Sequence, residues 1–206
     1  MAVSRHAAAL FGSQGVANTT GDDIAAVAGI STRTVWRYFR SKESCVEPVL
    51  AASAYRFMTS LRRWPLSASF EDFLIEDLSE SSPTPQDLAD DIASIRLISL
   101  VRDEPALRAS WLMVCGQAEQ AFTPVIARRL DLPADDFQVR LSSVSAIAAV
   151  RVVYEEISVS AVTGVRTYTP EGVIRELGRA IRISSNEPIC DPRRLRRLSD
   201  ADEPYL

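Results

Sequence analysis

Hydrophobic side chains recur three or four residues apart along almost the whole chain, which is the spacing of amphipathic helices. No convincing run of alternating polar and apolar residues between Asn-Gly or Asp-Gly turns favours a β-strand. Together with Gly, Pro and capping residues, the spacing predicts helices over about 3–13, 20–29, 31–39, 42–63, 68–80, 85–102, 104–130, 134–163 and 170–185. Pro124 lies inside one of them, where we expect a kink or a break. The pattern therefore predicts an all-α fold.

The composition is that of an ordinary globular domain. The 206 residues are 47% hydrophobic and 24% charged. No apolar run approaches the roughly 20 residues that a membrane span needs, and no secretory signal is visible, so we expect a cytoplasmic protein that does not bind membranes. Three scattered cysteines and a single histidine, His6, supply no set for a zinc site or a His-dependent catalytic site. We therefore expect no metal, no cofactor and no enzyme activity.

Charge is unevenly distributed. Residues 1–63 contain eight basic and four acidic side chains, whereas acidic groups predominate in the remainder and bring the chain to a net charge of −4. A basic N-terminal quarter on an acidic body is typical of a polyanion-binding head. Chance clustering is the alternative, so charge alone does not decide the function.

A segment near the N-terminus combines two short helices with a tight turn. Thr20, with Asp23 three residues later, predicts a capping box at the start of the first helix. Ala25 lies on its inner face, where a large side chain would push the second helix away, and Gly29 occupies the turn, where a positive φ costs least. Val35 returns from the second helix to pack on the first. This spacing fits the helix-turn-helix of DNA-binding proteins, although an αα-hairpin without a ligand shares it.

The outward positions of the second helix favour DNA over the empty hairpin. Its first turn carries hydroxyls and a guanidinium, and large cationic or polar-tipped side chains follow, which suit base edges and phosphates. These candidate DNA-binding residues are Ser31, Thr32, Arg33, Thr34, Trp36, Arg37 and Tyr38.

With these residues in view, the chain resembles the TetR family of bacterial transcriptional regulators. The likeness covers about residues 5–50, at Ala7, Leu10-Phe11, Gly15, Thr19-Thr20, Ile24-Ala25, Ala28-Gly29-Ile30-Ser31, Thr34-Val35, Tyr38-Phe39 and Ser41-Lys42-Glu43. Arg33, Arg37-Tyr38-Phe39 and residues 100–107 more loosely resemble actinobacterial members such as mycofactocin-system regulators. That looser resemblance implies an acyl-CoA-like ligand.

The resemblance also implies roles for single residues. Positions that match phosphate contacts of the family are Thr20, Tyr38 and Lys42. Positions that match its base-reading face are Thr32, Arg33 and Thr34. Arg33 stands where the family usually has Gly, and Trp36 stands where it usually has Tyr. Trp36 is therefore open to either a phosphate contact or a partly buried position.

One helix-turn-helix covers few base pairs, so specific binding requires two heads held by a dimer. Residues 141–164 suit an interface, because their small side chains let helices approach and their Val and Ile residues supply apolar area. We expect them to form an intersubunit four-helix bundle with the last helix, through Ser145, Ala149, Val153, Ile157, Ala161, Ile174, Leu177 and Ile181. A helix buried within one subunit is the alternative.

The region between the head and this interface is expected to hold a sensor cavity. Candidate lining residues are Phe73, Arg96, Trp111, Met113, Gln117, Phe122 and Tyr154, each of which has a core or surface position as its alternative. The effector is expected to be small and apolar, with an acyl-type molecule suggested by analogy alone.

The sequence thus predicts a homodimeric, ligand-responsive repressor that binds a palindromic double-stranded DNA operator. Residues 1–45 would form the DNA-binding domain, 46–187 the ligand-binding and dimerisation domain, and 188–206 a flexible tail. The alternatives are a helical carrier of lipophilic ligands and an activator of the same fold.

Overall fold

The computed structural model describes residues 1–185 and 187–193. In chain order their elements are α1 (Ala2–Gln14), α2 (Gly21–Ala28), α3 (Thr32–Tyr38), the 3-10 helix η1 (Glu43–Val46), α4 (Glu47–Arg63), α5 (Phe70–Glu80), α6 (Pro85–Ser99), α7 (Pro105–Leu130), α8 (Phe137–Thr163) and α9 (Pro170–Ser184). None of the described residues lies in a strand, so the all-α prediction is confirmed. No helix in this part of the chain is both long and apolar enough to cross a bilayer.

Helix boundaries largely follow the capping residues. The backbone N–H of Asp23 donates to Thr20 Oγ1 at 3.1 Å and that of Thr20 donates to Asp23 Oδ2 at 2.8 Å, which confirms the capping box. Gly29 ends α2 with a φ of 66°. One boundary differs from the prediction: the 3-10 helix η1 precedes α4, and Pro48 lies in the first turn of α4, where proline fits. Helix α7 continues through the exposed Pro124, so there is no break at this position, and the expected kink stays a prediction.

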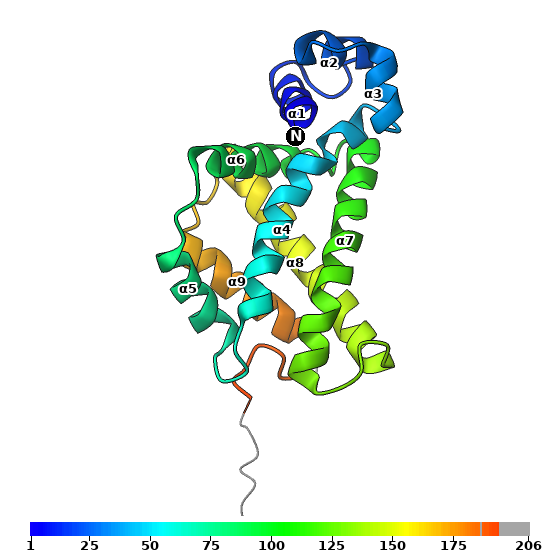
Figure 1. Ribbon diagram of the computed structural model, residues 1–206. Coiled ribbons are helices and arrows are strands. Elements are labelled where there is room, and N and C mark those ends of the chain that lie inside the picture. The colour runs from blue at the N-terminus through cyan, green and yellow to red at the C-terminus, as the bar shows by residue number, and fades with distance from the viewer. Residues whose placement is uncertain (186, 194–206) are drawn as a thin grey trace, which may run out of the picture.

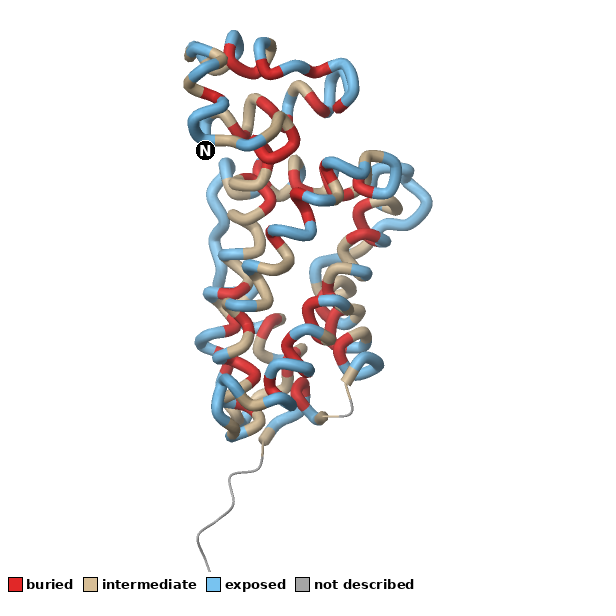
Figure 2. The backbone as a smooth tube through the Cα atoms, turned by 90° about the vertical axis from the view of Figure 1, so that its right-hand side faces the viewer, coloured by how far each residue is buried: buried red, intermediate tan, exposed pale blue. Residues whose placement is uncertain are grey.

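The helices form a small head on an elongated body. Figure 1 shows α1, α2 and α3 at one end, with α4 running from the head along the body beside α7. Helix α6 crosses the body directly below α1, and α8, which packs on α6, α7 and α9, passes behind α4 in this view. Figure 2 shows that buried positions recur at helical spacing along most of these elements. The head is therefore supported from below by α4 and α6.

Two hydrophobic clusters hold this arrangement together. The body core joins α4, α5, α7, α8 and α9 through buried side chains that include Leu61, Trp64, Phe70, Phe122, Ile126 and Leu177. The head core contains Phe11, Ile24, Val35, Leu50, Leu97, Leu107 and Trp111 among others. The head core thus continues from the head into α4, α6 and α7 and does not end at residue 45.

Residues 188–193, which the sequence assigned to a tail, pack on the body. Ile189 and Cys190 are buried, and the backbone N–H of Phe70 donates to the Cys190 carbonyl at 2.8 Å. The guanidinium of Arg129 donates to the Ile189 carbonyl at 2.6 Å and lies 3.6 Å from the Trp64 ring centroid. These contacts make residues 188–193 part of the body, and residues 194–206 of the expected tail lie outside the described residues.

Candidate nucleic-acid interface and effector cavity

Helix α3 has one buried side, which packs on the head core, and one polar side, which is exposed. Val35 is fully buried against Ile24 and Ala25 of α2, which fixes the rotation of α3 about its axis. Ser31 caps the helix, since its Oγ accepts the backbone N–H of Thr34 at 3.2 Å. The side chain of Arg33 is exposed and points away from this core. The predicted helix-turn-helix is therefore present, with its polar side accessible.

Aromatic and cationic groups share the end of this face. The Arg37 guanidinium lies 4.8 Å from the centroid of the Tyr38 ring and donates to the Tyr38 hydroxyl at 3.0 Å. Trp36 is 45% exposed, yet its ring lies against the start of α2, where a Cβ on Gly21 would come within 2.1 Å of it. Trp36 therefore both packs on the backbone of α2 and presents an edge to solvent, and Gly21 provides the space.

Two of the residues predicted to contact DNA form hydrogen bonds within the protein. Thr32 donates its hydroxyl to Asp22 at 2.5 Å. The Lys42 ammonium donates to the carbonyls of Val16, at 2.5 Å, and Thr19, at 2.8 Å, and its side chain is only one-quarter exposed. Lys42 thus fastens the loop that precedes α2, a role that the sequence analysis did not identify.

An apolar cavity of about 260 Å³ lies where the head core meets the body core. Leu50, Ile98 and Trp111 line it from the head core, whereas Met58 and Val150 line it from the body core. Its volume is close to the lower end of the range for small-molecule sites, which often lie between domains. A ligand here would touch both clusters at once.

The lining differs from the predicted one. Trp111 and Tyr154 line the cavity. The remaining predicted side chains do not: Phe73 and Phe122 pack in the body core, and Arg96, Met113 and Gln117 are exposed. Polar lining residues that the sequence analysis missed include Asp91, Cys115 and Arg151.

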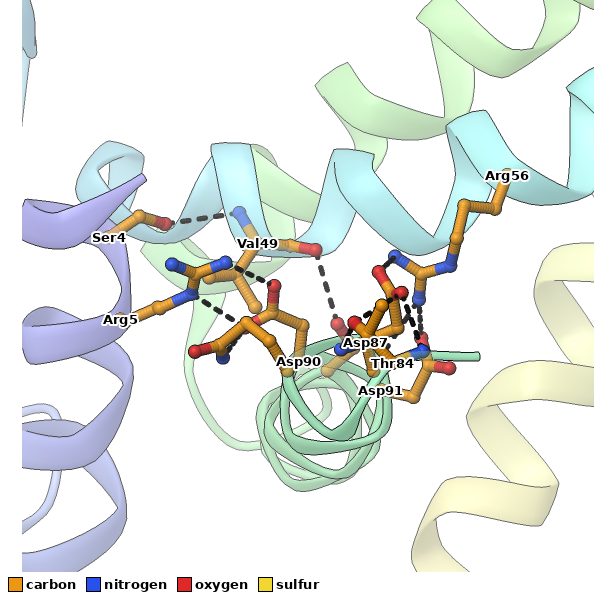
Figure 3. Close-up of polar contacts among 10 residues, drawn as sticks. Ser4, Arg5, Val49, Arg56, Thr84, Asp87, Asp90 and Asp91 are labelled. Atoms are coloured by element: carbon orange, nitrogen blue, oxygen red, sulfur yellow. Dashed lines mark hydrogen bonds and ion pairs between the residues drawn. The ribbon is translucent and has the colours of Figure 1, made fainter. Parts of the chain in front are cut away.

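Helix α6 connects the cavity to the head. Asp91 and Ser94 line the cavity from α6, and the adjacent Asp90 accepts two hydrogen bonds from Arg5 of α1, both at 2.9 Å. These hydrogen bonds lower the pKa of Asp90 below its usual value. Arg56 of α4 binds Asp91 on the same helix, and Figure 3 shows the two arginines reaching α6 from opposite sides. Neighbouring carboxylates on α6 thus join the head and the cavity wall.

The predicted dimer residues lie in three environments. Ile157, Ile174, Leu177 and Ile181 are buried within the subunit's own core, Ser145, Ala149 and Val153 are half-buried, and Ala161 is exposed. The buried four therefore pack within the single chain, and their predicted role in an interface stays a prediction. Apolar side chains that do reach the surface of α8 at helical spacing are Phe137, Leu141, Val144 and Val152.

An all-α chain with an N-terminal helix-turn-helix and a cavity in its helical body has the architecture of a one-component DNA-binding regulator. Residues 5–49 match the family model described as bacterial regulatory proteins of the tetR family, and the chain belongs to this family of transcriptional regulators. Residues 85–168 match the model of the MftR C-terminal domain, which confirms the looser resemblance to mycofactocin-system regulators. No curated protein sequence matches the chain.

Three solved structures align with the chain over about nine-tenths of their length, each with a TM-score below 0.5. A TetR-family repressor, FadR of Thermus thermophilus in complex with lauroyl-CoA, is 18% identical, with a TM-score of 0.49 over 89% of this chain and 91% of that one. A TetR-family regulator of Mesorhizobium loti is 16% identical, with a TM-score of 0.48 over 89% and 93% of the two chains. FadR of Bacillus subtilis in complex with stearoyl-CoA is 15% identical, with a TM-score of 0.45 over 90% and 97%. At these sequence identities and TM-scores, neither the ligands nor the binding sites of these structures can be transferred to this chain.

Proposed function

We propose that this TetR-family regulator is a dimeric repressor that binds a palindromic operator and is released by a small effector. The observation that carries the proposal is the placement of the cavity between the head core and the body core. A ligand larger than this cavity of about 260 Å³ must displace side chains of both clusters, because the surrounding interior is close-packed. A change at the cavity then alters how the head sits on the body.

Helix α6 is the element that we expect to transmit this change. One side of it lines the cavity through Asp91 and Ser94, and Asp90 holds α1 through Arg5. The effector needs to favour the DNA-incompetent arrangement by only about 1.4 kcal/mol to change affinity tenfold.

The exposed apolar side chains of α8 support a dimer. Leu141, Val144 and Val152 lie on one side of the helix and are about half exposed, so a second copy would cover apolar surface that water now contacts. An isologous interface built on this helix places two heads on one duplex, one DNA turn or about 34 Å apart. The proposed interface thus uses the exposed stripe and leaves Ile174, Leu177 and Ile181 in the core.

The cavity walls support an apolar effector, of which an acyl chain is one example. Leu50, Phe57, Met58 and Ile98 contribute hydrocarbon surface from α4 and α6. Burial of such a chain is favourable by about 25 cal/mol per Å² of apolar surface.

Genomic footprinting with the purified protein tests the proposal. We expect protected sites with two inverted half-sites upstream of genes whose transcription in vitro falls when protein is added. Arg33→Ala should reduce discrimination at one position in each half-site by about 1–3 kcal/mol and leave binding to random DNA nearly unchanged. Equal losses on operator and random DNA would remove Arg33 from base recognition.

Other outcomes separate the alternatives. Increased transcription from the protected promoters would make the protein an activator. Absence of any DNA shift at low salt, together with binding of lipophilic molecules, would favour a carrier and overturn the regulator.

A further inference from the structure

The charged groups at the cavity are unequally exposed. Among the described residues that line it, Asp91 is the one acidic side chain and Arg151 the one basic side chain. Asp91 is 38% exposed and forms an ion pair with Arg56, which also pairs with Asp87. Water screens charges at this side of the cavity. The group around Arg151 is less exposed, so its charge acts more strongly on a bound molecule.

Arg151 belongs to a cluster with more cations than anions. Its Nη1 donates to Glu155 Oε1 at 2.9 Å, and the Trp111 indole N–H donates to the same oxygen at 3.2 Å. The other oxygen of Glu155 lies 3.8 Å from Arg108. The Glu155 side chain is only 9% exposed. Two guanidinium groups therefore share one buried carboxylate, which leaves the cluster with one positive charge in excess.

Apart from Asp91, which pairs with Arg56, no other described lining group carries a charge that could offset that of Arg151. Burial raises the pKa of Cys115 to about 12 and that of Tyr154 to about 12, so both remain neutral at pH 7. The Tyr154 hydroxyl has no hydrogen-bond partner within residues 1–185 and 187–193, and Arg151 uses only one of its five N–H groups there. The side of the cavity wall that holds Arg151 thus offers unused donors together with positive charge, while Asp91 lies on α6 and pairs with Arg56.

We propose that Arg151 binds the carboxylate of an amphipathic effector whose hydrocarbon part fills the cavity. The inference rests on the proposed effector site and specifies the chemistry of its ligand. The planar guanidinium can hold a carboxylate through parallel hydrogen bonds, and the Tyr154 hydroxyl supplies a further donor from the next turn of α8. Glu155 acts as a positioning residue, because its bonds to Arg151 and Trp111 fix the guanidinium beside the cavity.

Calorimetric titration with three probes of equal chain length tests the inference on the full chain. Dodecanoate carries an anion, methyl dodecanoate presents the same carbonyl without charge, and dodecylammonium carries a cation. We expect dodecanoate to bind at least about tenfold more tightly than the ester, and the ammonium to bind most weakly. Arg151→Met should reduce the preference for dodecanoate over the ester to less than about threefold, while Arg151→Lys should keep part of it.

Arg140→Met is the matched control, since Arg140 is an exposed arginine on the same helix and does not line the cavity. The Arg140→Met protein should bind the three probes in the same order of affinity as the wild type. Circular dichroism melts show whether each variant is folded. Equal binding of dodecanoate and the ester, or an unchanged preference in Arg151→Met, would overturn the inference while leaving the effector site in place. Failure of all three probes to bind would overturn the inference and the apolar effector, whereas DNA binding, measured in parallel, tests the regulator separately.

Discussion

The DNA-binding head and the effector cavity differ in how their functional residues are spaced along the chain. The candidate DNA contacts all lie within residues 20–42, on α3 and on the segments that flank α2 and α3. The cavity takes its lining from residues as far apart as Leu50 and Val173, on five helices. One site is therefore specified by local spacing, and the other by the packing of distant helices.

This difference predicts different responses to mutation. In the head, one buried side chain sets the direction of several contact residues, because α3 is only two turns long. In the body, each helix contributes a few side chains to a wall that its neighbours also support. A single substitution in the head should therefore strongly reduce DNA binding, whereas a single substitution in the cavity wall should change ligand binding only moderately.

Val35→Asp should have the largest effect. Val35 is fully buried between α2 and α3, so the substitution places an unpaired carboxylate in the head core, at a cost of about 3 kcal/mol or more. We expect loss of operator binding and a lower melting temperature by circular dichroism. Val27→Asp is the control, because Val27 is half exposed on α2 and should change stability by less than about 0.5 kcal/mol. A stable, DNA-binding Val35→Asp protein would contradict the assigned packing of α3.

The head could be predicted closely because its signals are local. The reciprocal cap of Thr20 and Asp23, the positive φ of Gly29 and the buried Val35 each follow from residues a few positions apart. Helical periodicity also located the body helices, to within about three residues at most ends. Lys42 was predicted as a phosphate contact, but its hydrogen bonds to two loop carbonyls were not predicted, because those carbonyls lie more than twenty residues earlier in the chain.

The cavity could not be predicted in the same way. Periodicity shows that α7 is helical, but it does not show which neighbouring helix covers each face. Both Met113 and Phe122 were predicted to line the cavity, whereas Met113 is exposed and Phe122 lies in the body core. The same limit applies to α9, where Leu177 packs within the subunit. Arg151 was not among the predicted lining residues, because its placement at the cavity depends on Glu155 and on Trp111 from another helix.

Lys42→Met sharpens the comparison within the head. Because the ammonium of Lys42 donates to two loop carbonyls, its loss should loosen the loop before α2 and weaken DNA binding by about 2 kcal/mol. The slope of log affinity against log salt should change little. Arg37→Met, at an exposed arginine that we expect to contact phosphate, should instead lower that slope by about 0.9 per lost contact. Fluorescence anisotropy across a salt series distinguishes the two, and a large change of slope in Lys42→Met would restore it as a phosphate contact.

Asp90→Asn tests the link between the two regions. It weakens the bidentate pair with Arg5 and should lower the free energy of unfolding at pH 7 by about 1–2 kcal/mol, since Asp90 is buried but Arg5 is partly exposed. The pKa of Asp90 is lowered in the folded state, so its contribution is present above the unfolded value of about 3.9 and is lost as the pH falls through the folded value. Urea titrations should show the two proteins converging at acidic pH. Asp135→Asn, at an exposed loop position, should match the wild type throughout.

Ser158→Ala should have the smallest effect, and it should be stabilising. Ser158 is fully buried in α8, and its hydroxyl has no partner within the described part of the chain. Removing a buried, unbonded hydroxyl and improving helix propensity together should raise the free energy of unfolding by about 1 kcal/mol. Ser143 is equally buried on the same helix, but its Oγ donates to the Val139 carbonyl at 2.8 Å, so Ser143→Ala should gain less or lose stability. Urea denaturation measures both variants, and a loss of stability in Ser158→Ala would mean that its hydroxyl is bonded in solution.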